Sequence, residues 1–230
     1  MEDRIITKVK ELKQMSLVDY TFIEIKDNGE PIIDLASLGF ILDPMYFKDG
    51  LTDTPKMYLR EGLVKKLKNA EKKLNGLRFK LWDGYRSRDV QNNIYQKFWK
   101  ELHELHPKWS DEKLQEEAGR FLSPPFGLRI PPHSTGGSID LTLVDKEGKE
   151  LDMGTGFDCF TKKSAPFYYE IYRDKKQIRT NRRILRSVMG SEGFTMDDDE
   201  WWHFDFGNQM WALKSGKMFA VYGECIINSQ

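Results

Sequence analysis

Residues 137–144 read Gly-Ser-Ile-Asp-Leu-Thr-Leu-Val, an alternation that predicts a β-strand. Successive side chains of a strand point to opposite faces, so Ile139, Leu141 and Leu143 share one apolar face. Asp140 lies on the other face, between a serine and a threonine. An acid that interrupts an otherwise apolar strand is either hydrogen-bonded within the fold or available for chemistry.

Helical and strand patterns alternate along the chain on both sides of this segment. In the helical segments, apolar residues recur every three or four positions. The predicted elements are a helix over 56–75, a strand over 79–82, helices over 87–106, 110–121 and 181–190, and a strand over 201–206. We therefore expect an α+β fold with a small, mainly antiparallel sheet and helices packed on one face.

Size and composition limit the class of protein. The 230 residues fit a single domain, 1–230, in which the first 55 residues carry no clear pattern. Lys plus Arg number 36 and Asp plus Glu number 36, and this zero net charge argues against a general nucleic-acid binder, which carries a basic excess. Aromatic residues make up 13% of the chain, too large a share for a disordered protein.

Cysteine usage and the N-terminal stretch indicate a cytoplasmic protein. Cys159 and Cys225 are too few for a disulfide scaffold, and neither belongs to a CxxC pair. Residues 1–15 are charged throughout and lack the apolar core of a signal peptide. No run approaches the roughly 18 apolar residues of a spanning helix, so no membrane partner is expected.

Histidines and acids recur at spacings that suit a metal site. Asp140 follows His133 by seven residues, and His203 follows Glu200 by three. A catalytic zinc site uses three nitrogen or oxygen ligands and keeps one position open for water, and a further carboxylate can carry protons. Each residue also has an ordinary interpretation: a loop histidine, a hydrogen-bonded strand acid, a solvated acidic run and a core histidine. The residues alone leave both interpretations open.

Five segments match, in the same order, the motifs of one enzyme family. His-Ser-Thr-Gly-Gly-Ser-Ile-Asp at 133–140 and Glu-Trp-Trp-His at 200–203 resemble the HxxGxAxD and ExWH motifs of the D-Ala-D-Ala dipeptidases. Trp-Asp-Gly-Tyr-Arg at 82–86, Met-Gly with Phe-Asp within 153–158, and segment 181–194 are similar to further motifs of that family.

The resemblance, which runs from about residue 77 to residue 206, implies a zinc metallopeptidase. Its substrate would be D-Ala-D-Ala or a closely related small dipeptide of peptidoglycan and cell-wall metabolism. The resemblance implies one zinc ion per chain, held at the sheet surface by His133, Asp140 and His203. Glu200 would act as the general base and acid.

Two further residues have counterparts in the family. Arg86 matches the arginine that stabilises the oxyanion of the tetrahedral intermediate. Asp158 matches an acid that pairs with the ammonium group of the substrate, and Asp152 lies close by. The expected partner is thus a small dipeptide, while the oligomeric state is not predicted.

Glu200 and His203 impose a condition on the backbone between them. In a straight strand, side chains three positions apart point to opposite faces, yet both must reach the metal. We therefore expect a turn over 199–202 and a regular strand from about His203. Trp201 and Trp202 are then expected to pack as walls of the site.

The chain departs from the family just before the first histidine ligand. Pro131 and Pro132 stand where the family has two serines that help to hold the C-terminal carboxylate of the substrate. Proline offers neither a hydroxyl nor a backbone N–H. Either another donor, such as a nearby Arg or a backbone N–H from residues 40–60, replaces the serines, or the requirement for a free carboxylate is relaxed.

Other functions stay open. A carboxypeptidase or endopeptidase on peptidoglycan stem peptides would keep the chemistry and change the substrate. A zinc-stabilised binding module would keep the fold, but a structural zinc needs neither Glu200 nor Arg86. His-Glu-Leu-His at 103–106 is one residue short of the HExxH metalloprotease motif, so we expect an exposed helix end there.

Overall fold

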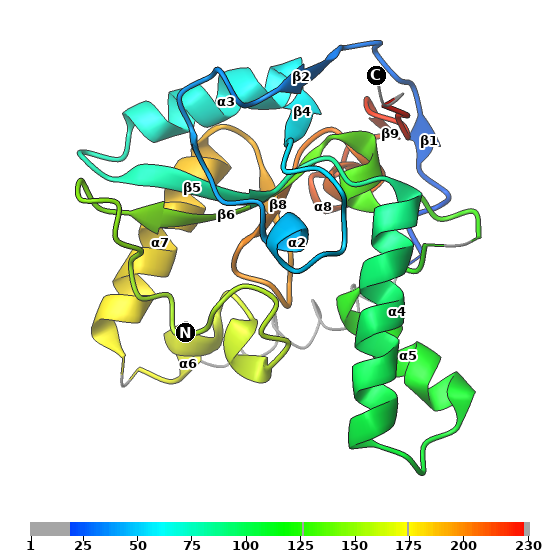
Figure 1. The fold of residues 1–230 in the computed structure, drawn as a ribbon. Helices are drawn as coiled ribbons and strands as arrows, with labels where there is room; N and C mark the ends of the chain where they lie inside the picture. Colours follow the sequence, from blue (N-terminus) through cyan, green and yellow to red (C-terminus); the bar gives the residue numbers. More distant parts are fainter. Residues whose placement is uncertain (1–18, 126, 174, 228–230) are drawn as a thin grey trace.

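Five strands form the central sheet of the computed structural model, which describes residues 19–125, 127–173 and 175–227 (Figure 1). Their order in the sheet is β3 (Ile41–Leu42), β5 (Arg78–Asp83), β6 (Ser138–Val144), β8 (His203–Asp205) and β7 (Thr195–Met196). Neighbouring strands are antiparallel, except for the parallel pair β3 and β5. The expected α+β class and mainly antiparallel sheet are confirmed.

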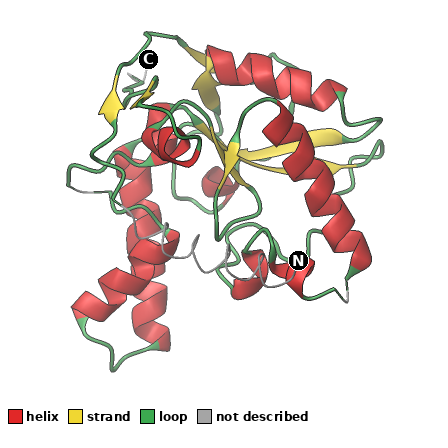
Figure 2. Ribbon diagram, turned by 180° about the vertical axis from the view of Figure 1, so that it is seen from behind, coloured by secondary structure: helices red, strands yellow, loops and turns green. Residues whose placement is uncertain are grey.

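Strand β6, at the centre of the sheet, is buried on both faces. Its apolar face, with Ile139 and Leu141 fully buried, belongs to the main hydrophobic core. Helices α3 (Glu61–Lys72) and α7 (Lys176–Ser191) cover this face and contact each other (Figure 2). The opposite face of β6 carries Asp140, so the sheet places this acid away from the apolar core.

The other side of the sheet carries less helix. Helix α2 (Met45–Lys48) lies in front of the sheet, and α4 (Arg88–Leu105) and α5 (Asp111–Phe121) form a hairpin that projects from the body (Figure 1). Ser87 and Ser110 cap α4 and α5, because each hydroxyl accepts a hydrogen bond from a backbone N–H of the first turn. The two long core helices therefore lie on one face, while α2 lies over the other and α4 and α5 project from the body, so the expectation that the helices pack on one face is confirmed only in part.

Smaller elements complete the described part of the chain. They are α6 (Tyr168–Ile171), α8 (Gln209–Lys214), single 3₁₀ turns at Pro132–Thr135 and Lys162–Ser164, the parallel pair β1 (Glu24–Ile25) and β9 (Phe219–Ala220), and the antiparallel pair β2 (Ile32–Asp34) and β4 (Tyr58–Arg60). Within the first 55 residues, the described part from residue 19 onward thus contributes short strands that pair with later segments.

The helix predicted over 56–75 is wrong at its N-terminal end. Residues 58–60 form β4, because their backbone pairs with β2, and the helix begins only at Glu61. Leu59 is fully buried at the spacing that a helix would also give it. Apolar periodicity therefore could not separate the strand from the helix that follows it.

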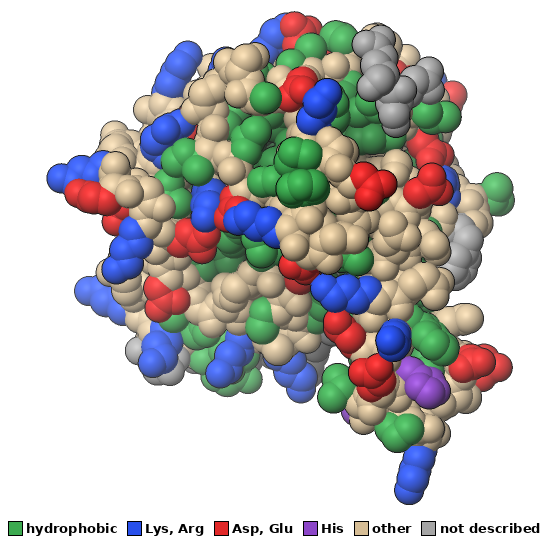
Figure 3. Space-filling view, viewed as in Figure 1, with side chains coloured by type: hydrophobic (Ala, Val, Ile, Leu, Met, Phe, Trp, Pro, Cys, Tyr) green, Lys and Arg blue, Asp and Glu red, His purple; other side chains and the backbone are tan. Residues whose placement is uncertain are grey.

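Charged side chains of both signs are interspersed over the face seen in Figure 3, in keeping with the balanced net charge. None of the helices in the described ranges is long and apolar enough to cross a membrane. The charged stretch 1–15 lies outside the described residues.

Candidate metal centre and active site

His133, Asp140 and His203 converge on one point. His133 lies in the 3₁₀ turn Pro132–Thr135, and the β6–β8 register places Asp140 directly opposite His203. His133 Nε2 lies 3.1 Å from His203 Nδ1 and 3.4 Å from Asp140 Oδ2, and His203 Nδ1 lies 3.1 Å from Asp140 Oδ1. One ligand atom of each residue lies within 4.8 Å of those of the other two. The sequence-predicted triad is therefore assembled by the fold.

The geometry of these atoms fits a zinc ion. In a tetrahedral site with zinc bonds of roughly 2.0–2.1 Å, ligand atoms lie about 3.3 Å apart. The outward nitrogen of each ring has an acceptor: His133 Nδ1 lies 2.7 Å from the Gly84 carbonyl, and His203 Nε2 lies 3.0 Å from Asp205 Oδ1. A neutral ring that donates outward presents a bare lone pair inward. With both rings neutral, two lone pairs and a carboxylate would face one another, an arrangement that a bound cation would stabilise.

Asp205 holds His203 from behind. Its Oδ1 also accepts hydrogen bonds from Ser138 Oγ at 2.6 Å and from Asn208 Nδ2 at 2.7 Å. Such an outer partner fixes the orientation and tautomer of a histidine ligand. Asp205 is not among the residues predicted from the sequence. Its position two residues after His203, on the same face of a strand, is the signal that could have found it.

Glu200 lies in the turn that precedes β8 and lines the same cleft as the three ligands. Enclosure in the cleft, followed by the negative charge of Asp197 and Asp140, raises the pKa of Glu200 well above its usual value. The turn ends at residue 202 and the regular strand begins at His203, as expected. This turn brings Glu200 and His203 to one side, which a straight strand would not do.

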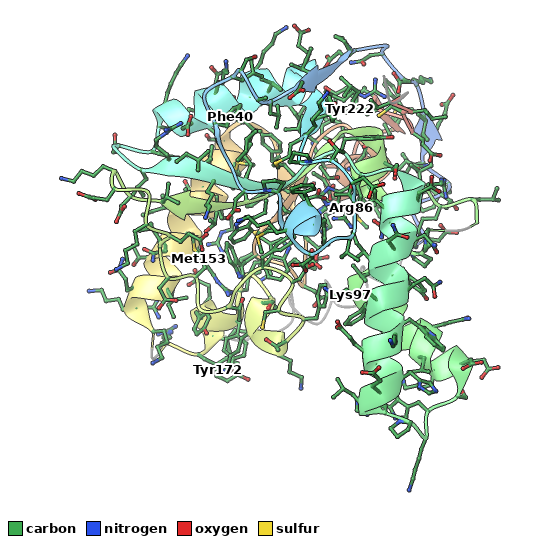
Figure 4. The ribbon with its side chains drawn as sticks, in the orientation of Figure 1. Phe40, Arg86, Lys97, Met153, Tyr172 and Tyr222 are labelled. Atoms are coloured by element: carbon green, nitrogen blue, oxygen red, sulfur yellow. The ribbon has the colours of Figure 1, made fainter. Side chains whose placement is uncertain are left out.

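Arg86 is buried between α2 and α4 in the interior of the molecule (Figure 4). Its Nε donates to Asp83 Oδ2 at 3.0 Å and its guanidinium lies 3.6 Å from Asp140 Oδ2. A bulge after Leu81 makes Asp83 the register partner of Asp140. Burial works to lower the pKa of Arg86, but the surrounding acids and Tyr46 outweigh it and keep the guanidinium charged.

The same electrostatic balance acts on Asp140. Burial alone would raise the pKa of its carboxyl group, but His133 and His203 outweigh burial and hold the pKa below its usual range. Asp140 is therefore an anion, the form that a metal ligand requires.

Asp158 lines the cleft, whereas the nearby Asp152 is exposed and does not. Burial, opposed by the charge of Arg86, raises the pKa of Asp158 to about 7. The residue has a φ of 52° in the loop after β6, a conformation that side chains other than glycine adopt infrequently. The fold thus brings this acid to the cleft and leaves its neighbour in solvent.

The cleft holds about 870 Å³, including its open mouth. Trp201 and Trp202 are buried in the core beneath it and are not among its lining residues, so the expectation that they form its walls is wrong. His103 and His106 lie away from it at the end of α4, where their rings stack on Trp99 and Trp109. Of the described histidines, only the two ligand candidates line the cleft.

Two imidazoles and a carboxylate around one point, with a second carboxylate and an arginine beside them, are the equipment of a metal-dependent hydrolase. A sequence profile described as D-ala-D-ala dipeptidase matches residues 59–221. The chain belongs to the D-Ala-D-Ala dipeptidase family and is a zinc metallopeptidase. The resemblance inferred from the five motifs is thereby confirmed.

Relatives of this chain carry the same description. The chain is 29% identical to a D-alanyl-D-alanine dipeptidase of Synechocystis sp. over 222 residues, which cover 85% of this chain and 90% of that protein. It is 33% identical to the D-alanyl-D-alanine dipeptidase of Enterococcus faecium over 125 residues, 54% of this chain and 59% of that protein. Among solved structures, VanYB in complex with D-alanine-D-alanine shares 12% identity at a TM-score of 0.45, over 86% of this chain and 94% of that one.

Proposed function

We propose that this chain hydrolyses D-Ala-D-Ala or a closely related small dipeptide, with one zinc ion on His133, Asp140 and His203. The observation that carries the proposal is the convergence of these three donor atoms beside Glu200 in a single cleft. Family membership supports the substrate class. A cytoplasmic role in cell-wall peptide metabolism belongs to the same proposal.

Zinc bound at this triad would supply a water nucleophile at neutral pH and polarise the scissile carbonyl. Glu200 would take the proton of the attacking water on a carboxylate oxygen and return it to the nitrogen of the leaving amine. Its raised pKa favours the protonated form, which is the form that returns a proton to the leaving amine.

Arg86 and Asp158 would act on the two ends of the reacting amino acid. The Arg86 guanidinium, held by Asp83 and Gln91, is oriented before the substrate arrives and would stabilise the developing oxyanion. Donors of this kind are commonly worth about 3–4 kcal/mol. Asp158 would pair with the substrate's ammonium group, which favours the ionised form of its carboxyl.

A carboxypeptidase or endopeptidase acting on stem peptides is the second candidate. It is favoured by the open mouth of the cleft and by Pro132, which lines the cleft without a hydrogen to donate to a terminal carboxylate. The chemistry at Glu200 would be the same for both candidates, so substrate length decides between them.

The test is an assay of the zinc-loaded chain on D,D-, L,D- and L,L-dipeptides, with tripeptides extended at either end. We expect hydrolysis of D-Ala-D-Ala and little cleavage of the tripeptides. Ready cleavage of tripeptides would favour the second candidate. No hydrolysis of any peptide by protein with full zinc occupancy would contradict both.

A further inference from the structure

The cleft contains a group of donors that the proposed chemistry does not use. Ser123 and Arg129 come from the segment between α5 and the Pro132–Thr135 turn, and both line the cleft with Glu200 and the ligand triad. The Arg129 guanidinium lies 4.5 Å from the ring centroid of Tyr20, which also lines the cleft. We call Ser123 and Arg129 the donor wall, together with Tyr20, whose hydroxyl already donates to the Ile130 carbonyl at 3.1 Å.

The hydroxyl of Ser123 is buried and makes no well-formed hydrogen bond among the described residues, although it lies close enough to the Tyr20 hydroxyl to oppose the burial that raises the pKa of Tyr20. The Ser123 backbone, in contrast, is held tightly. Its carbonyl accepts from Gln91 Nε2 at 2.7 Å, and Gln91 Oε1 accepts from Arg86 at 2.8 Å. Ser123 is therefore fixed relative to Arg86, while its own hydroxyl, beside that of Tyr20, lacks a well-formed hydrogen bond. A buried unsatisfied hydroxyl is costly unless something else supplies its partner.

The segment that carries Arg129 is also anchored. Arg88 of α4 donates to the carbonyls of Pro125 at 3.0 Å and Arg129 at 3.3 Å, and Glu224 binds the Arg88 side chain at 2.6 Å. Donors on an anchored backbone lose little entropy when they bind an anion. The donor wall is thus a prepared surface and not a chance arrangement of side chains.

Charge within the cleft is divided between different neighbours. Asp158 interacts with Tyr46 and Arg86, whereas Arg129 interacts with the ring of Tyr20 and with the charge of Asp19. The acid proposed for the ammonium group and the cation of the donor wall therefore occupy different parts of the cleft. A small zwitterion, with an ammonium group at one end and a carboxylate at the other, is complementary to this division.

We propose that Arg129 and Ser123 bind the C-terminal carboxylate of the substrate and replace the donors that Pro131 and Pro132 lack. A guanidinium and a hydroxyl together offer the charge-assisted hydrogen bonds that a carboxylate requires. This inference rests on the proposed dipeptidase function. Under this proposal the substrate must have a free C-terminal carboxylate. The groups that bind it come from a different segment of the chain than the one that carries His133.

The test compares D-Ala-D-Ala with its C-terminal amide in the zinc-loaded chain. In Arg129→Gln, kcat/KM for the free acid is expected to fall roughly 10- to 100-fold, mainly through KM, because a charged hydrogen bond is lost. The rate on the amide, which has no charge to lose, is expected to stay the same. Ser123→Ala is expected to show the same pattern with a smaller fall. Arg173→Gln, at an exposed arginine that does not line the cleft, is the matched control.

The outcomes separate the two proposals. A wild-type chain that hydrolyses neither substrate would overturn the proposed function and this subsite together. A wild type that cleaves acid and amide equally well would overturn the subsite alone. An equal fall in kcat/KM on the acid and on the amide in Arg129→Gln would also overturn the subsite. The same holds if the preference for the acid is unchanged in both Arg129→Gln and Ser123→Ala.

Discussion

At the scale of single residues, Glu200 is the group whose removal separates metal binding from turnover. It lines the cleft but is not one of the three atoms that converge. Glu200→Gln keeps the size of the side chain but removes the carboxylate that would accept the proton. Because Glu200 is not a proposed ligand, zinc content should stay near one ion per chain. Turnover of D-Ala-D-Ala should fall by roughly two to four orders of magnitude. Metal analysis and kcat measure the two quantities.

His203→Ala is the complementary variant and is expected to lose zinc and activity together. Full zinc occupancy in His203→Ala would remove the ligand assignment. An unchanged kcat in Glu200→Gln would instead show that another group moves the proton.

Asp205 gives a second prediction at this scale. Asn at position 205 would keep the shape but weaken the acceptor that holds His203 Nε2. Zinc affinity, measured by competition with a chelator, should fall by about 10- to 100-fold, the usual size for such partners. Ser138→Ala removes only one donor to Asp205 and should have a smaller effect. An Asp205→Asn chain with wild-type affinity would show that the carboxylate does not support the ligand.

At the scale of elements, the loop that carries Asp158 is held by α7. Arg182 of α7 is 4% exposed and donates, each time at 2.8 Å, to the carbonyls of Met153, Lys163 and Ala165. Arg182→Met would leave these acceptors unpaired, so the free energy of unfolding should fall by about 3 kcal/mol or more. KM should rise as well, since Asp158 would lose its fixed position. Denaturant titration and steady-state kinetics measure these changes.

Arg183 provides the matched control in the same helix. Its side chain is 57% exposed and pairs with Glu170 at the surface. Arg183→Gln should therefore cost less than about 1 kcal/mol and leave KM unchanged. Equal losses in the two variants would contradict a special role for the buried arginine.

Elements with local signals were predicted well. Helix α4 begins after Ser87 and ends before Pro107, because a cap and a proline mark its ends in the sequence itself. The turn before His203 followed from the need to turn Glu200 toward the ligands. By contrast, β4 and the short N-terminal strands exist only through pairing with distant segments, and no local pattern records that pairing.

The candidate site followed the same division. The three proposed ligands and Glu200 were predicted from the resemblance of their motifs to one family, since their spacing alone left ordinary interpretations open. The network around Asp205 and the donor wall depend on which segments the fold brings together. Ser123, for example, lies in a proline-rich loop whose sequence gives no sign of the cleft.

At the scale of the whole molecule, zinc should raise the thermal stability. A ligand that binds only the folded state adds about 4 kcal/mol at a thousandfold excess over its Kd. For a chain of this size that corresponds to a Tm shift of roughly 8–16 °C. In calorimetric scans of the wild type, removal of the metal with a chelator should lower Tm by this amount. His203→Ala should show no zinc-dependent shift, and a similar shift there would place the stabilising metal elsewhere.

The direct opposition of Asp140 and His203 across β6 and β8 has a kinetic consequence. A metal bound to Asp140 and His203, and also to His133, would act as a cross-link between neighbouring strands in the middle of the sheet. These strands could then separate only after a coordination bond breaks, so the zinc-loaded core should open slowly. In limited proteolysis of the zinc-loaded chain, we therefore expect cleavage in the projecting α4–α5 hairpin well before cleavage in the sheet (Figure 1).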